Sequence, residues 1–186
     1  LSSHIQSEES KVFVQAEKAS YRPEGLVLEG DVLIEQKLRK LSSAYAEVTF
    51  GSESIADFES IRTIKCQGHT NLVFIDEETS AEHALESFGG IFFDNSHKQV
   101  YLYSPEDAAG SGEQVSFRDQ VGEISGDEML LDFTYLESKA VLTNLSVDGG
   151  VRILNRKSVT TDQVQYALAD TANFNFETQE LTLKSN

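Results

Sequence analysis

The chain has 186 residues, of which 39% are hydrophobic, 15 are Lys or Arg and 31 are Asp or Glu. The net charge of −16 repels nucleic-acid phosphates and anionic membrane surfaces, so we expect no nucleic acid among its partners. Cys66 is the only cysteine, which excludes an internal disulfide and a cysteine-ligated zinc site. No stretch reaches the length of a membrane helix, so we expect no membrane span in this chain.

Residues 1–10 are polar and are predicted to form a flexible N-terminal segment. We expect residues 11–186 to form a single all-β domain, because helical periodicity is weak throughout. The hydrophobic share is low for this length, which favours an elongated or open sheet over a sphere.

The clearest pattern is a strand–turn–strand phrase, formed by 16–21, a turn at 22–25 and a second strand at 26–34. Even positions of the second strand are apolar, whereas the odd positions Glu29, Asp31 and Glu35 are charged. A period of two predicts one buried and one solvated face. A third strand at 41–50 alternates in the same way, with Ala44, Ala46, Val48 and Phe50 predicted to share the buried face.

Looser copies of the phrase begin at 81, 126 and 169. A short apolar strand is predicted at 71–76, and 104–113 is predicted to be a surface loop. In the third copy, the odd positions from Val141 to Ile153 are predicted to point inward. The fourth copy stops where its Gly-Asp continuation should follow, so we expect either truncation at the C-terminus or a last strand that pairs with another partner.

The repeated hairpins predict a common apolar interior, which we interpret as a candidate lipid-binding groove. Each methylene that leaves water contributes about 0.8 kcal/mol, so one acyl chain could supply on the order of 10 kcal/mol. The predicted groove-facing residues are Val12, Val14, Leu26, Leu28, Val32, Ile34, Val48, Phe92, Val100, Leu102, Met129, Leu131, Phe133, Val147, Val151, Ile153, Phe174 and Phe176.

No arrangement of residues predicts catalysis, a metal site or a cofactor. The four histidines lack metal-ligand spacing, and the motifs of common hydrolases, metalloproteases and nucleotide-binding sites are missing. Acid clusters such as 76–78 could supply a glycosidase pair, but a chain with 31 acids forms such pairs by chance. We therefore predict a protein that is not an enzyme.

Two other hypotheses stay open at this stage. The alternating strands could form a filled β-stack that serves only assembly, since periodicity does not distinguish a packed core from a groove. A glycan-binding jellyroll is a weaker alternative, because the chain has no Trp to form a sugar platform.

The phrase resembles the repeated signature of the OstA-like superfamily, which includes LptA, the periplasmic domain of LptC and the N-terminal domain of LptD. The resemblance rests on Ala16-Glu17-Lys18-Ala19-Ser20-Tyr21 followed by Leu26-Val27-Leu28-Glu29-Gly30-Asp31-Val32. Glu17 replaces the commoner Asp, and Asp31 the commoner Asn. The copies are unevenly spaced, and 51–80 match poorly, so the member of the superfamily stays open.

The resemblance implies a twisted, open β-jellyroll that carries the acyl chains of lipopolysaccharide between the inner and outer membranes. It also implies a periplasmic location. Partners would be lipopolysaccharide and other OstA-like domains, which would pair head to tail through edge strands.

Overall fold

The computed structural model describes residues 12–36, 38–51, 61–75, 80–105, 113–136, 139–155 and 165–185. These residues form strands and turns, with no helix among them, and the predicted all-β fold class is confirmed. The strands are β1 (Val12–Gln15), β2 (Lys18–Arg22), β3 (Gly25–Gln36), β4 (Arg39–Phe50), β5 (Ile61–Ile75), β6 (Glu82–Ser87), β7 (Gly90–Asp94), β8 (Gln99–Tyr103), β9 (Val115–Arg118), β10 (Gly122–Gly126), β11 (Glu128–Leu136), β12 (Lys139–Asn155), β13 (Gln165–Asn175) and β14 (Glu180–Lys184).

All strand pairs in this part of the chain are antiparallel and belong to one sheet that folds over itself. The long strands β3, β4, β5, β12 and β13 run through both layers, and each half pairs with different short strands. β5, for example, pairs with β7 through Thr63–Lys65 and with β6 through Thr70–Ile75. We call the layer that contains β2, β7, β8, β11 and β14 layer A, and the layer that contains β1, β6, β9 and β10 layer B.

The long strands bend where they pass between the layers. The register shifts at Glu29/Val32 in β3, at Ser43/Tyr45 in β4 and at Asp148/Val151 in β12. Gly30 and Gly149 have φ values of 72° and 78°, which side chains with a Cβ rarely adopt. Such bulges increase local twist and turn a strand out of its plane, which is how one sheet supplies two facing layers.

Buried hydroxyl groups satisfy the backbone at the bend. Ser43 Oγ lies 3.0 Å from Thr70 Oγ1, and the Thr70 hydroxyl donates to the carbonyl oxygen of Gly68 at 3.0 Å. Ser87 Oγ accepts from the Gly90 N–H at 2.9 Å and donates to the carbonyl oxygen of Tyr103 at 2.7 Å. These bonds replace ladder hydrogen bonds that a bulge interrupts, so the bend can be buried at low cost.

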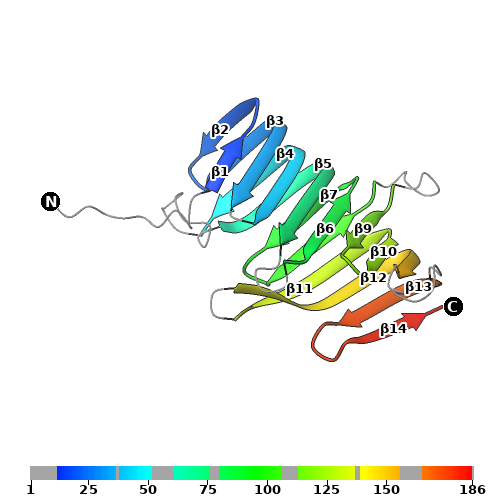
Figure 1. Ribbon diagram of the computed structural model, residues 1–186. Coiled ribbons are helices and arrows are strands. Elements are labelled where there is room, and N and C mark those ends of the chain that lie inside the picture. Colours follow the sequence, from blue (N-terminus) through cyan, green and yellow to red (C-terminus); the bar gives the residue numbers. More distant parts are fainter. Residues whose placement is uncertain are drawn as a thin grey trace.

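The strands stack along one axis into an elongated molecule, with β1 and β2 at one end and β13 and β14 at the other (Figure 1). Apolar side chains from both layers meet in one core cluster. The described part of the chain contains no helix that is long and apolar enough to cross a membrane.

Bulges also account for several departures from the predicted strand faces. In β4 the register shift at Ser43/Tyr45 turns Ser43 inward and leaves Ala44 exposed. In β12 a shift opposite Asp132/Phe133 places Leu142 against the core and leaves Val141 exposed. β5 is longer than predicted, because the strand begins at Ile61 rather than Asn71.

Candidate functional site

Two unbroken apolar ladders face each other between the layers. In layer A, cross-strand pairing joins ten residues from β2 to β14: Tyr21, Leu26, Val48, Ile64, Phe93, Val100, Leu131, Leu145, Phe174 and Leu181. In layer B, pairing joins nine residues from β1 to β13: Val14, Ile34, Leu41, Leu72, Leu85, Phe117, Ile124, Ile153 and Ala167. At about 4.8 Å per strand, each ladder is on the order of 40 Å long.

Burial is deepest beside the bend and decreases away from it. The residues next to the bend are almost completely buried, as Leu28, Val32, Leu102, Met129 and Val147 show. Their side chains form the packed core of the molecule. A bound hydrocarbon chain would therefore contact the outer parts of the inner faces first.

The side of the interior opposite the bend, which we call the mouth, is lined by aromatic rings. His83 stacks on Phe74 with ring centroids 4.9 Å apart and on Phe117 at 5.8 Å. Phe176 meets the edge of Phe117 at 6.4 Å and the ring of Phe174 at 4.8 Å. Phe117 lies in layer B. Phe174 lies in the part of β13 that belongs to layer A, and Phe176 comes directly after this strand, so these rings bridge the two layers.

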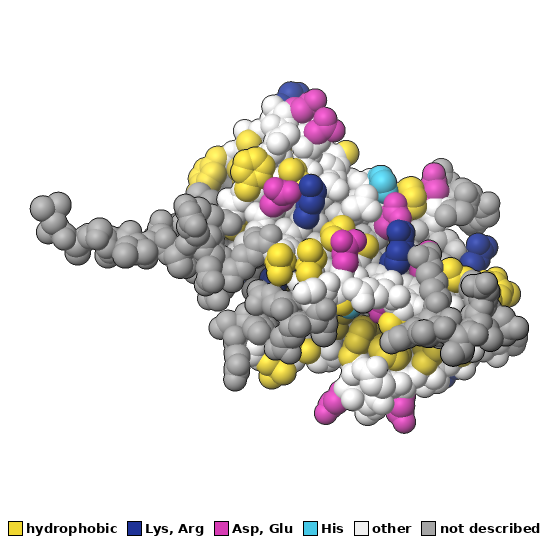
Figure 2. All heavy atoms as spheres, viewed as in Figure 1, with side chains coloured by type: hydrophobic (Ala, Val, Ile, Leu, Met, Phe, Trp, Pro, Cys, Tyr) yellow, Lys and Arg dark blue, Asp and Glu magenta, His cyan; other side chains and the backbone are white. Residues whose placement is uncertain are grey.

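Within the described residues, no further strand covers either end of the ladders. β2 pairs only with β3, and β14 pairs only with β13. The terminal ladder residues Tyr21 and Leu181 are therefore 66% and 45% exposed. Figure 2 shows hydrophobic side chains at the surface over the β1–β2 end and again around β12 and β13. The apolar track thus reaches both ends of the stack.

Most of the predicted groove-facing residues lie on the inner faces. The core cluster and the side chains packed against it contain Val12, Leu26, Leu28, Val32, Ile34, Val48, Val100, Leu102, Met129, Leu131, Phe133, Val147, Val151, Ile153, Phe174 and Phe176. Val14 pairs with inward-facing Ile34, but it lies on the edge strand β1 and is 41% exposed.

The predicted inward orientation of Phe92 is wrong. Phe93 pairs with Val100 and Ile91 with Leu102, so these two residues face the core. Phe92 pairs instead with Tyr101 and Lys65 on the outer face of layer A. The run Ile-Phe-Phe has no alternation, so its orientation depends on the register across the turn at 95–98.

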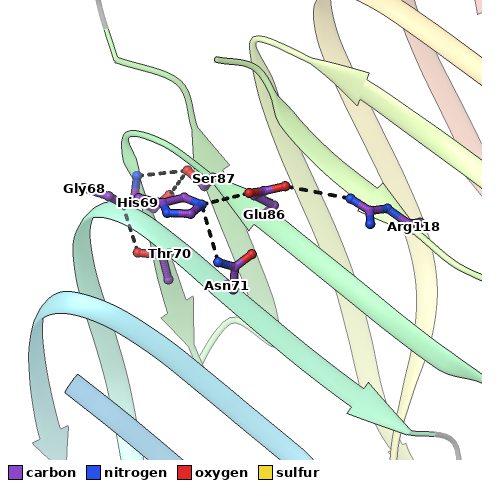
Figure 3. A network of polar contacts seen from close by, with 8 residues as sticks. Gly68, His69, Thr70, Asn71, Glu86, Ser87 and Arg118 are labelled. Atoms are coloured by element: carbon purple, nitrogen blue, oxygen red, sulfur yellow. Dashed lines mark hydrogen bonds and ion pairs between the residues drawn. The ribbon is translucent and has the colours of Figure 1, made fainter. Parts of the chain in front are cut away.

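The outer face of layer B carries a polar network that is separate from the apolar interior (Figure 3). His69 Nε2 lies 2.8 Å from Glu86 Oε1, and Arg118 forms ion pairs with Glu86 at 3.8 Å and Glu123 at 3.5 Å. These groups connect β5, β6, β9 and β10. Their exposure limits such pairs to about 1 kcal/mol or less, so the network joins neighbouring strands but adds little stability.

Cys66 lies in the core beside the bend and is fully buried. Burial raises the pKa of its thiol to about 12, with a smaller opposing effect from a hydrogen bond to Ser43. The thiol is therefore protonated near neutral pH and acts as a small apolar side chain. Among the described residues, no group of His, Cys, Asp and Glu could hold a metal ion.

Sequence reasoning missed much of the mouth. Phe74, His83 and Phe117 were not predicted as site residues, although all three lie on inner faces. Phe74 lies two residues after Leu72 in the predicted strand 71–76, so alternation alone would have placed both side chains on the same face. His83 pairs with Phe74 of the preceding strand β5, but Phe117 lies in β9, much later in the sequence, and only the fold brings β9 beside β6.

Comparisons with known proteins agree with this architecture. No protein-family model and no curated protein matches the chain. The structure is similar to the crystal structure of LptH from Pseudomonas aeruginosa, the LptA-homologous periplasmic component of the conserved lipopolysaccharide transport device. The match has a TM-score of 0.55 and 13% sequence identity, and it covers 86% of this chain and 95% of that chain. At this identity the likeness concerns the fold: the chain has the LptA-like β-jellyroll that its OstA-like hairpin phrase predicted.

Proposed function

We propose that the chain is a periplasmic, non-enzymatic protein of the OstA-like superfamily that transports lipopolysaccharide between the inner and outer membranes. The observation that carries the proposal is the pair of apolar ladders, which run the length of the stack and end at uncovered strands. Hydrocarbon chains gain free energy along such a track without requiring specific polar contacts.

The acyl chains would enter at the mouth rather than beside the bend. Phe50, Phe74, Phe93, Phe174 and Phe176 are only partly buried, so they have surface left to cover. The deeper residues already contact one another and would take up a chain only if the layers moved apart. The headgroup would stay in water, where the repulsion from a net charge of −16 is screened within about 10 Å.

The free edges at the two ends fit association with similar domains. β1 and β2 at one end, and β13 and β14 at the other, have backbone groups available for strand pairing. A head-to-tail contact of this kind does not close on itself, so repeated copies would extend both ladders into a longer track.

A ligand-free scaffold is the second candidate function. The near-complete burial of Leu131, Val147 and Val151 favours it, because these side chains already fill the centre. The scaffold and the lipid carrier share the same fold and the same edges. They differ in whether lipid contacts the mouth.

A photocrosslinking experiment separates these two functions. A photoreactive phenylalanine analogue replaces Phe174 on the inner face, and its neighbour Asn173 on the outer face serves as the matched control. We expect a lipopolysaccharide adduct from position 174 and none from 173 in cells with an outer membrane. Equal labelling at both positions, or none at 174, would support the scaffold and contradict the lipid carrier.

A further inference from the structure

One polar atom in the apolar mouth lacks a partner. His83 Nδ1 is buried and makes no hydrogen bond among the described residues. His83 lies on the inner face of β6, since Leu85 and Ser87 on the same strand are buried. A buried nitrogen without a partner is unfavourable, and native proteins retain such atoms mainly where a ligand or water completes them.

The surroundings of His83 restrict what that partner can be. Phe74 covers the imidazole ring with an interplanar angle of 18°, and Phe117 stacks on it with an angle of 23°. Hydrogen bonds of an imidazole lie in the plane of its ring, so a polar partner could reach the buried Nδ1 only along the ring edge, between the two stacked rings. The next residues inward on these strands are Leu72 and Leu85, whereas Gln36 and Arg39 lie farther along the mouth. A ligand with one polar group attached to an apolar chain fits such surroundings.

The position of His83 along the ladder indicates which part of a lipid would reach it. Cross-strand pairing places Gln36, Arg39, Phe74 and His83 in one row at the mouth. The cationic side chain of Arg39 is exposed in this row, about 10 Å from His83 across two strand spacings. A lipid with its headgroup near Arg39 and its tail on the ladders would have the junction of head and tail beside His83.

We propose that His83 is a specificity-determining residue that hydrogen-bonds the carbonyl or hydroxyl oxygen of an acyl chain close to its junction with the headgroup, an inference that rests on the proposed function. A carbonyl oxygen of an ester or amide would accept from the Nδ1 tautomer that carries a proton. A hydroxyl on the acyl chain would donate to the other tautomer. Lipids with an acyl linkage would therefore bind more tightly than lipids with the same tail joined by an ether.

Two nonionic detergents test this preference below their micelle concentrations. Sucrose monolaurate has an ester carbonyl, whereas dodecyl maltoside has a tail of the same length joined by a glycosidic ether oxygen, with no carbonyl. Affinities are measured by displacement of N-phenylnaphthylamine from the full chain. We expect the ester to bind about three- to tenfold more tightly, as one net hydrogen bond allows.

Substitutions at position 83 assign the preference to this residue. His83→Phe should lose the preference and bind both detergents with equal affinity, and His83→Gln should keep part of the preference. The control His97→Phe changes an exposed histidine in the 95–98 turn and should keep all of it. In imidazole ¹⁵N spectra, the Nδ1 signal of His83 should shift with the ester and not with the ether.

The outcomes distinguish this inference from the proposed function. If neither detergent displaces the probe, the lipid-binding function itself is contradicted. If both bind wild type equally, or the ester preference persists in His83→Phe, lipid binding stands and the role of His83 is overturned. Circular dichroism identifies a variant that fails to fold, in which case His83→Gln decides.

Discussion

Asp127 covers Gly149 where β12 bends. The Asp127 N–H donates to the carbonyl oxygens of Asp148 and Gly149, both at 2.9 Å, and a Cβ added to Gly149 would collide with the Asp127 carboxylate. Glu17 and Gly30 repeat this arrangement at the other end of the molecule, with a 2.9 Å bond from the Glu17 N–H to the Gly30 carbonyl. At both bends, therefore, the acid that begins a hairpin phrase packs against the glycine at which the long strand bends.

Replacing Gly149 with Ala should therefore destabilise the fold. The substitution imposes the left-handed strain of roughly 1–2 kcal/mol and also displaces Asp127. Gly68→Ala is the matched control, because Gly68 has a similar φ of 76° but open space around its Cα. Urea denaturation should show a larger loss of stability for Gly149→Ala than for Gly68→Ala. Equal losses would mean that the contact with Asp127 adds nothing.

Truncation along the layer A ladder should have a position-dependent effect. Leu131 is completely buried, so Leu131→Ala should cost about 2–5 kcal/mol through lost contacts and an unfilled cavity. Leu181 is a member of the same ladder but lies at its uncovered end, so Leu181→Ala should cost less than about 1 kcal/mol. Chemical denaturation of the two variants compares them directly, and similar losses would contradict the uncovered end at β14.

Charges placed at the ends should prevent association between copies. Tyr21→Lys and Leu181→Lys put an ammonium group at each terminal ladder position, where a paired neighbour would have to desolvate it. We expect wild type to associate with increasing concentration in analytical ultracentrifugation and the double variant to stay monomeric. Val121→Lys, at an exposed apolar site in the turn between β9 and β10, should behave like wild type. A monomeric wild type at all concentrations would contradict head-to-tail pairing.

Alkaline pH should weaken the fold through Cys66. Burial raises the pKa of the folded thiol to about 12 from its usual value of about 9. The folded state thus holds this proton more tightly than the unfolded state. The contribution of the protonated thiol to the free energy of unfolding is therefore complete below pH 9 and is lost as pH rises toward 12.

Between pH 8 and pH 10, the free energy of unfolding of wild type should fall by about 1 kcal/mol more than that of Cys66→Ala, because one pKa unit corresponds to about 1.4 kcal/mol. Urea midpoints at the two pH values measure it. Rapid maleimide labelling of native Cys66, or an identical pH response in the alanine variant, would indicate that the bend is open to solvent.

The sequence by itself determined the strand class and most of the inner face. Alternation placed Leu28, Val32, Leu131 and Val147 correctly, because a side chain in a strand has only two directions and water selects between them. Gly30 of the hairpin phrase lies at the bend of β3, where it adopts a backbone conformation that few other residues tolerate.

Only the tertiary structure decided the rest. A one-residue shift reverses the side chains on one side of it, so the register shift at Ser43/Tyr45 in β4 placed Ser43 inward and Ala44 outward without any change in local composition. The orientation of Phe92 depended on pairing with Tyr101, and the stacking of His83 between Phe74 and Phe117 depended on three strands meeting. Such contacts arise from register between distant segments, which the period of a single strand does not encode.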